Sequence, residues 1–231
     1  MDKKEALKIV QKNGLELKNL PDHLKKDEEI FFEAFKLHAA ALQYADDSIK
    51  KDKKIILKCV KQWGPALQYA DVSLKKDKKI VLEAVKKDGL SLKYADDSLK
   101  KDKKIVLEAV RKDGLSLKYA DVSLKKDKKI VHEAVMLPNN GFNLKYADVS
   151  LKKDREFILE VVKQAGDDLS FLAYTDVSFK KDKEIVLEAI KKIGGRALEY
   201  ADVSLKKDPE ILAAAEDEEK RTEENQPDYY E

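Results

Sequence analysis

The sequence predicts an all-α protein: an α-solenoid of about eight short two-helix repeats, closed by a C-terminal capping helix. A 25-residue phrase recurs along the chain, and residues 102–126 differ from residues 77–101 only at Arg111 and Val122. Hydrophobic residues within each phrase are spaced three and four apart, as they are on one face of a helix. The chain is also 40% charged and only 7% aromatic, a composition typical of repeated helices rather than of a sheet protein.

Each repeat begins with an aspartate that is well suited to start a helix. Its carboxylate can accept hydrogen bonds from the free backbone N–H groups of the first turn, and its charge suits the positive helix end. A Lys-Lys-Asp triplet supplies this residue at Asp27, Asp52, Asp77, Asp102, Asp127, Asp154, Asp182 and Asp208. Asp2 opens a degenerate first repeat, residues 1–26. We predict that it is an N-terminal cap, because Glu5 stands where later repeats have a core residue such as Ile80.

The repeat that starts at Asp77 illustrates the first predicted element, an α-helix over residues 78–87. The apolar face of this helix is broad enough to pack between two neighbouring helices. It is formed by Ile80, Val81, Ala84 and Val85, with Leu82 beside them. Asp88 and Gly89 end the helix, and we expect the glycine to take the left-handed conformation.

The second predicted element is a shorter helix over residues 90–95. A turn or short 3₁₀ segment then returns to the next cap, and Leu99 in that segment is expected to enter the core. Neither helix is long enough to be stable alone, so packing between neighbouring repeats must supply the stability.

The C-terminal end combines a capping helix with an acidic tail. The capping helix is predicted over residues 208–216, with Pro209 in its first turn, where proline is tolerated. The solenoid domain therefore spans residues 1–216, and residues 217–231 are predicted to be an acidic disordered tail. The whole chain has a formal net charge of +2, yet nine acidic and only two basic residues follow Asp208. The body is therefore basic, and the tail is hypothesised to fold back on it and compete with ligands.

The repeated motif is specific enough to suggest a family. Ala-Leu-x-Tyr-Ala followed by Leu-Lys-Lys-Asp, as in residues 66–70 and 74–77, resembles an uncharacterised helical-repeat family that is catalogued only as a domain of unknown function. Its members look like arrays of short paired helices in bacterial, protist and large-virus proteins. The resemblance covers about residues 27–215 and implies an α-solenoid, but it carries no catalytic residue. The first repeat departs from the motif at Asn19, which leaves open whether it is a repeat or a cap.

Site chemistry is sparse in this sequence. The three histidines lie in different repeats, and no spacing resembles a zinc site. The single cysteine, Cys59, excludes an intramolecular disulfide framework and favours a reducing setting. No glycine-rich phosphate loop is present, and Gly194-Gly195 is interpreted as a turn. We therefore expect no enzyme activity, no cofactor and no metal. An enzyme would need a cleft built by the irregular repeats near residues 138–142 and 167–168.

Length varies only between the two helices of a repeat, so the turns there form one candidate partner-binding edge. Repeat proteins tend to place insertions on one face, which is often the binding face. The sequence predicts a non-enzymatic protein–protein interaction scaffold, although loop edges also tolerate insertion without any function. The candidate residues are Trp63, Pro138, Asn139, Asn140, Phe142, Asp167, Asp168 and Arg196.

The alternative function is a basic scaffold that binds nucleic acid or another polyanionic surface. Lysine pairs follow the helix-capping aspartates, and stacked repeats would align them in a candidate polyanion stripe. Its members are Lys53, Lys54, Lys78, Lys79, Lys103, Lys104, Lys128 and Lys129. Each cluster also holds an aspartate, and no aromatic residues are interleaved for base stacking, so this alternative ranks second.

The cellular setting is expected to be cytoplasmic. No stretch is apolar and long enough to cross a bilayer, and no secretory signal follows the charged residues 1–5. We expect a monomer whose partner is a protein that the sequence does not identify.

Overall fold

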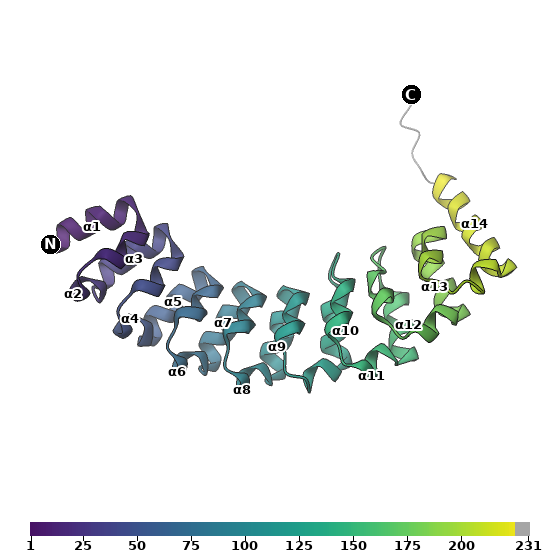
Figure 1. Cartoon of the computed structure of the whole chain (residues 1–231), viewed down its shortest axis with the longest axis horizontal. Coiled ribbons are helices and arrows are strands. Elements are labelled where there is room, and N and C mark those ends of the chain that lie inside the picture. The colour runs from purple at the N-terminus through teal and green to yellow at the C-terminus, as the bar shows by residue number, and fades with distance from the viewer. Residues whose placement is uncertain (225–231) are drawn as a thin grey trace, which may run out of the picture. The chain divides into compact units, whose positions relative to one another are not determined.

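The computed structural model describes the backbone of residues 1–224 and the side chains of residues 1–221. The chain divides into two compact units, Met1–Asp121 and Val122–Glu231, which are treated separately below. Within residues 1–224 every regular element is a helix and none is a strand. Each unit is a stack of short helical repeats, which confirms the predicted all-α solenoid class (Figure 1).

The first unit is built from three kinds of helical segment, which follow one another in each repeat: a long α-helix, a 3₁₀-helix and, in the first four repeats, a short return helix. The long helices are α1 (Lys3–Lys12), α3 (Glu28–Leu37), α5 (Lys53–Gln62), α7 (Lys78–Lys87) and α9 (Lys103–Lys112). The 3₁₀-helices are η1 (Gly14–Asn19), η2 (Ala39–Tyr44), η3 (Gly64–Tyr69), η4 (Gly89–Tyr94) and η5 (Gly114–Tyr119). The return helices are α2 (Asp22–Lys25), α4 (Asp47–Lys51), α6 (Val72–Lys75) and α8 (Asp97–Lys100).

The second unit follows the same plan with less regular segments. Its long helices are α10 (Lys128–Met136), α12 (Arg155–Gln164), α13 (Lys183–Ile193) and α14 (Pro209–Glu224). Its 3₁₀-helices after the long helices are η7 (Gly141–Tyr146), η8 (Ser170–Tyr174) and η10 (Gly194–Tyr200). The return segments are η6 (Leu124–Lys126), α11 (Val149–Lys152), η9 (Val177–Lys181) and η11 (Leu205–Lys207).

The second element of the repeat is a short helix, as predicted for residues 90–95, and it is of the 3₁₀ type. A 3₁₀-helix has three residues per turn, so residues three apart lie on one face. Gly89, Leu92 and Ala95 of one repeat have this spacing and are all buried. The apolar spacing of this short segment therefore suits a 3₁₀-helix. The return segment was predicted as a turn or short 3₁₀ segment. It is a 3₁₀-helix in η6, η9 and η11 and a short α-helix in the other repeats, and its Leu99 is buried as expected.

The role expected for Gly89 was wrong. Among the described residues only Asn139 and Gly194 have a positive φ, so Gly89 does not end its helix in the left-handed conformation. A Cβ on Gly89 would instead collide with the carbonyl oxygen of Ala109 in the next repeat. Glycine is needed here because two repeats approach each other closely, not because the backbone turns.

The core lies between successive long helices. The predicted apolar face of α7 is fully buried, with Ile80, Val81, Ala84 and Val85 each at 0% exposure. In the first unit α5, α7 and α9 pack side by side in chain order; in the second unit α12, α13 and α14 do the same (Figure 1). α7 in the first unit and α13 in the second are thus each sandwiched between two long helices, as the width of the apolar face predicts.

A backbone hydrogen bond also joins each return segment to the one before it. The amide of Asp71 donates to the carbonyl oxygen of Lys50 at 3.0 Å, and the amide of Asp96 donates to that of Lys75 at 3.0 Å. The same bond recurs from Asp46 to Lys25, Asp121 to Lys100, Asp148 to Lys125, Asp176 to Lys152 and Asp202 to Lys180. Adjacent repeats are therefore held in register by main-chain atoms as well as by apolar packing.

The last helix is longer than predicted. α14 continues to Glu224, so residues 217–224 are helical where a disordered tail was expected. Arg221 pairs with Glu218 one turn earlier at 3.2 Å, and such pairs support an exposed helix. Residues 225–231 of the predicted tail lie outside the described residues. None of the described helices combines the length and the apolar content needed to span a membrane.

Candidate partner-binding edge

The turns between each long α-helix and the following 3₁₀-helix form the turn edge. In each unit they lie at the opposite end of the long helices from the return segments, for example from α6 and α8 in the first unit and from α11 in the second (Figure 1). Six of the eight candidate partner-binding residues lie in these turns, and Phe142 and Arg196 lie beside them in the first turns of η7 and η10. Trp63 belongs to the first unit, and the other seven belong to the second.

Trp63 occupies a position that other repeats use for helix capping. In the next two repeats, Asp88 accepts a hydrogen bond from the Leu90 amide and Asp113 accepts one from the Leu115 amide, each at 2.9 Å. Tryptophan has no oxygen to accept such a bond, and η3 has no side-chain cap. Pro65 stands where Leu90 stands and has no N–H to be satisfied. The proline therefore removes the need for a cap and leaves position 63 available to a large side chain.

An open hollow of about 340 Å³ lies beside Trp63 on the turn edge of the first unit. Three successive turns line it through Trp63, Gly64, Pro65, Lys87, Asp88, Gly89, Lys112 and Asp113. The indole is half-buried, and its ring lies 6.2 Å from the ring of Tyr69. The hollow has the size of a small ligand or side-chain pocket, with an apolar platform on one side and charged groups on the other.

The insertion in the second unit is joined to the next turn by Asp168. The Gly141 amide donates to Asp168 Oδ2 at 2.9 Å, and the Ser170 amide donates to Asp168 Oδ1 at 3.1 Å. Burial tends to raise the pKa of Asp168, but the hydrogen bonds from Ser170 and Gly141 outweigh it and hold this pKa below its ordinary value. Asp168 is therefore a structural acceptor that ties two repeats together.

The other candidates of the insertion are placed differently. Pro138 and Asn139 are exposed, and Asn139 has a φ of 57°. Asn140 donates from Nδ2 to the Pro138 carbonyl oxygen at 2.9 Å, and Lys145 Nζ lies 4.9 Å from the centre of the Phe142 ring. Asn140 and Phe142 therefore stabilise the loop, whereas Pro138 and Asn139 are open to solvent.

Asp167 and Arg196 are brought together at a second hollow, of about 550 Å³, in the second unit. Its other lining residues are Lys191, Lys192, Ile193, Gly194, Gly195, Glu218 and Glu219. Sequence reasoning missed the contribution of Glu218 and Glu219, because α14 was expected to end before them. The signal that points to them is the tight Gly194-Gly195 turn, which leaves room for a neighbouring side chain.

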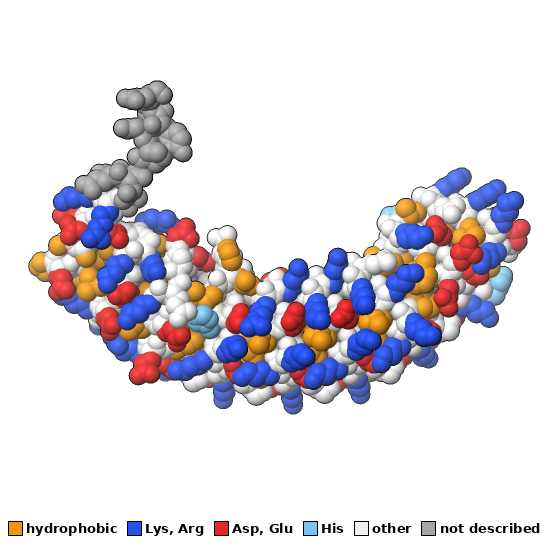
Figure 2. All heavy atoms as spheres, turned by 180° about the vertical axis from the view of Figure 1, so that it is seen from behind, with side chains coloured by type: hydrophobic (Ala, Val, Ile, Leu, Met, Phe, Trp, Pro, Cys, Tyr) orange, Lys and Arg blue, Asp and Glu red, His pale blue; other side chains and the backbone are white. Residues whose placement is uncertain are grey.

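Three of the eight lysines of the candidate polyanion stripe form ion pairs between successive repeats. Lys53 pairs with Asp77, Lys78 with Asp102 at 2.5 Å, and Lys128 with Asp154 at 2.7 Å, while Lys103 also has a partner. The second lysine of each pair is exposed and makes no ion pair with a described residue; these are Lys54, Lys79, Lys104 and Lys129. On the face shown in Figure 2, basic and acidic side chains are interleaved within each unit.

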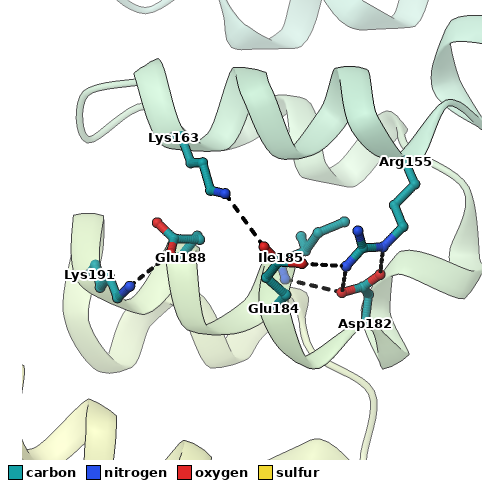
Figure 3. Close-up of polar contacts among 7 residues, drawn as sticks. All are labelled: Arg155, Lys163, Asp182, Glu184, Ile185, Glu188 and Lys191. Carbon is teal, nitrogen blue, oxygen red and sulfur yellow. Dashed lines mark hydrogen bonds and ion pairs between the residues drawn. The ribbon is translucent and has the colours of Figure 1, made fainter.

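A denser charge network joins α12 to α13 in the second unit (Figure 3). Arg155 donates from Nε to Asp182 at 2.6 Å and from a terminal nitrogen to Glu184 at 2.7 Å. Lys163 reaches Glu184 at 3.4 Å from the same helix as Arg155. The Arg155 guanidinium holds the pKa of Asp182 below its ordinary value, against the effect of burial. These charges join the long helices of two successive repeats.

Reactive groups are not clustered in the described part of the chain. No group of three or more His, Cys, Asp or Glu side chains among the described residues is arranged to hold a metal ion. Cys59 is fully buried in α5, and burial raises the pKa of its thiol to about 12. The Nε2 atom of His132 lies 2.9 Å from the side-chain oxygen of Gln164, a contact between helices of adjacent repeats.

One family model matches along nearly the whole chain. It is described as a domain of unknown function (DUF4116), and its longest matches each span two successive repeats. The matched segments are residues 2–50, 27–75, 52–100, 77–125, 102–138, 127–175, 170–206 and 182–215. No curated protein and no solved structure matches the chain.

Proposed function

The chain belongs to the DUF4116 family of domains of unknown function, and we propose that it is a non-enzymatic scaffold that binds another protein along its turn edge. The observation that supports this proposal is a paired change in one turn. Trp63 stands where other repeats have a capping residue, and Pro65 stands at the position whose backbone amide would need that cap. Losing a cap ordinarily costs about 1 kcal/mol, and the proline avoids that loss. The tryptophan is therefore accommodated without a stability penalty at the rim of a hollow.

The chemistry of the hollow suits a protein partner. Tryptophan is enriched among the residues that dominate binding energy at protein interfaces, and it contributes most when a partner covers it fully. The indole is half-exposed in the isolated chain, so a partner has apolar surface left to bury. Lys87 and Lys112 are exposed beside it and can supply polar contacts at the rim.

The test compares proteins captured from lysate by the wild type and by Trp63→His. Histidine already occupies the equivalent position at His38 without a cap bond, so the repeat accommodates it. A matched control is Val72→Asp on the return segment, where Asp47 and Asp97 stand in neighbouring repeats. The lysate is treated with nuclease. We expect Trp63→His to lose proteins that both the wild type and Val72→Asp recover. Equal recovery by all three proteins would contradict the proposal.

Nucleic acid binding is the second candidate function, favoured by one exposed lysine at the same position in successive repeats that forms no ion pair with a described residue. Within the first unit these are Lys54, Lys79 and Lys104. Helix layers are about 10 Å apart, whereas duplex DNA carries a charge about every 1.7 Å, so these lysines would contact only a small share of the phosphates along the duplex. Three phosphate contacts would give a salt dependence with a logarithmic slope of about −3. Mobility of DNA and RNA that is unchanged by the protein at low salt would exclude this function.

A further inference from the structure

The C-terminal part of α14 extends beyond the region where the helix is anchored. α14 has 16 residues, whereas α7 has 10, so it is longer by about 9 Å at a rise of 1.5 Å per residue. Its buried side chains are Ile211 and Ala215, and no residue from 216 to 221 is buried. We call residues 216–221 the acidic extension. It is held to the stack without burying an apolar side chain.

The acidic extension forms one wall of the second-unit hollow, and the last turn of the turn edge forms the other. Glu218 and Glu219 come from α14, and Lys192 and Arg196 come from the end of α13 and the start of η10. Gly195 makes this approach possible, because a Cβ there would lie 2.5 Å from Glu219 Oε1. Carboxylates therefore face basic side chains across the hollow.

Not all the basic side chains of this hollow form ion pairs with described acidic side chains of the second unit. Lys191 is paired with Glu188 at 2.7 Å, but within the described part of the chain Lys192 and Arg196 have no ion-pair partner. Both are exposed. Glu219 and Glu218 form no ion pair with Lys192 or Arg196, and Glu218 pairs with Arg221 of its own helix at 3.2 Å. An attraction across the hollow would therefore act over a longer distance, where salt screens it.

We propose that Lys192 and Arg196 bind a carboxylate-rich segment of a protein partner, and that the acidic extension of α14 competes with that segment for them. The proposal deepens the proposed function, on which it rests, by naming the partner chemistry at the turn edge of the second unit. A polypeptide is favoured over nucleic acid because the group already facing these side chains is a helix that carries carboxylates. A weakly anchored extension is displaced more readily than one held by apolar burial.

The test uses the full-length chain and a fluorescent decaglutamate peptide, with binding followed by anisotropy at low salt. Glu218→Gln with Glu219→Gln removes the two carboxylates of α14 that line the hollow without changing side-chain size, and it also releases Arg221 from its pair with Glu218. We expect the peptide to bind about threefold to fivefold more tightly through Lys192 and Arg196. Lys192→Gln with Arg196→Gln is expected to abolish the gain. The control is Glu216→Gln with Asp217→Asn, which removes the same charge from residues that do not line the hollow and are expected to leave affinity close to the wild-type value.

Circular dichroism of each variant shows whether α14 remains helical, so that loss of structure is not mistaken for loss of competition. Equal affinity of the peptide for the Glu218/Glu219 variant and its charge-matched control would overturn the proposal. So would a larger gain for single-stranded DNA than for the peptide, because that result assigns the basic residues to nucleic acid. The Trp63→His capture experiment is independent of these residues, so failure of the proposed function is recognisable separately.

Discussion

Gly64 and Ala84 lie so close together that a Cβ on Gly64 would be 2.6 Å from the carbonyl oxygen of Ala84. The glycine begins a 3₁₀-helix in one repeat, and the alanine lies in the long helix of the next. No real Cβ contact with an oxygen is this short, so any larger residue would push the two repeats apart. The spacing of the stack therefore depends on a missing side chain.

Replacing Gly64 by alanine is expected to lower the free energy of unfolding by about 1–3 kcal/mol, as overpacking of a close-packed contact does. Chemical denaturation followed by circular dichroism measures the change. Gly166→Ala is the control, because a Cβ there meets nothing within 4 Å and φ is not positive. The control should be neutral or slightly stabilising. Equal losses in both variants would show that the close approach is not what selects glycine.

Ser91→Ala is expected to raise the free energy of unfolding by about 1 kcal/mol, because the variant removes a buried hydroxyl that has no partner. Ser91 is 0% exposed, and its Oγ forms no hydrogen bond with a described residue. Two earlier repeats already have alanine there, Ala41 and Ala66. Ser98→Ala provides the contrast, since that hydroxyl is exposed and donates to Asp96 Oδ1 at 2.7 Å. A stability loss in Ser91→Ala would show that the hydroxyl is satisfied in solution.

Asp182→Asn is expected to lower the free energy of unfolding by about 0.5–1 kcal/mol at low salt, and by less at high salt. Asparagine still caps α13, so the variant isolates the ion pair with Arg155. Asp52→Asn is a matched control: Asp52 caps α5, but Glu28 stands where a basic residue would pair with it. That control should change stability little. Equal effects of the two substitutions on thermal unfolding would rule out a contribution from the pair.

Stability is expected to fall in acid as the helix-capping aspartates are protonated. The pKa values of Asp154, Asp182 and Asp208 are held below the ordinary value of 3.8, first by their ion pairs with Lys128, Arg155 and Lys183. The unfolded chain therefore binds protons at a higher pH than the folded chain does, so the stabilisation is fully present above 3.8. It is lost as the pH falls from about 3.8 through the lower folded values. Urea unfolding between pH 6 and pH 2 measures this, and Asn at all three positions should flatten the curve in that window.

Local chemistry explains which features could be predicted from the sequence. The aspartate caps were predictable because an Asp carboxylate binds amides two and three residues ahead, as Asp77 does at 3.0 and 3.1 Å. The buried face of α7 was predictable because helical spacing alone decides which side chains share a face. Trp63 was a candidate because it lies in a turn between two helices, but the role of Pro65 in replacing the cap was not predicted.

Other features depend on which residues two repeats bring together. The partner of Lys78 is Asp102, 24 residues later, and three of the eight lysines of the candidate polyanion stripe are paired between repeats. The second-unit hollow requires α14 to lie beside η10, and nothing in the local sequence of either element specifies that contact.

The sequence by itself determined the repeat length, because the same 25-residue phrase recurs along the chain. It also determined the helix starts and the apolar faces, because these depend on residues within about one helical turn of each other. Only the tertiary structure decided the role of the glycines, the partners of the lysines and the position of the hollows. Those depend on the distance between stacked repeats, which the packing of whole helices sets.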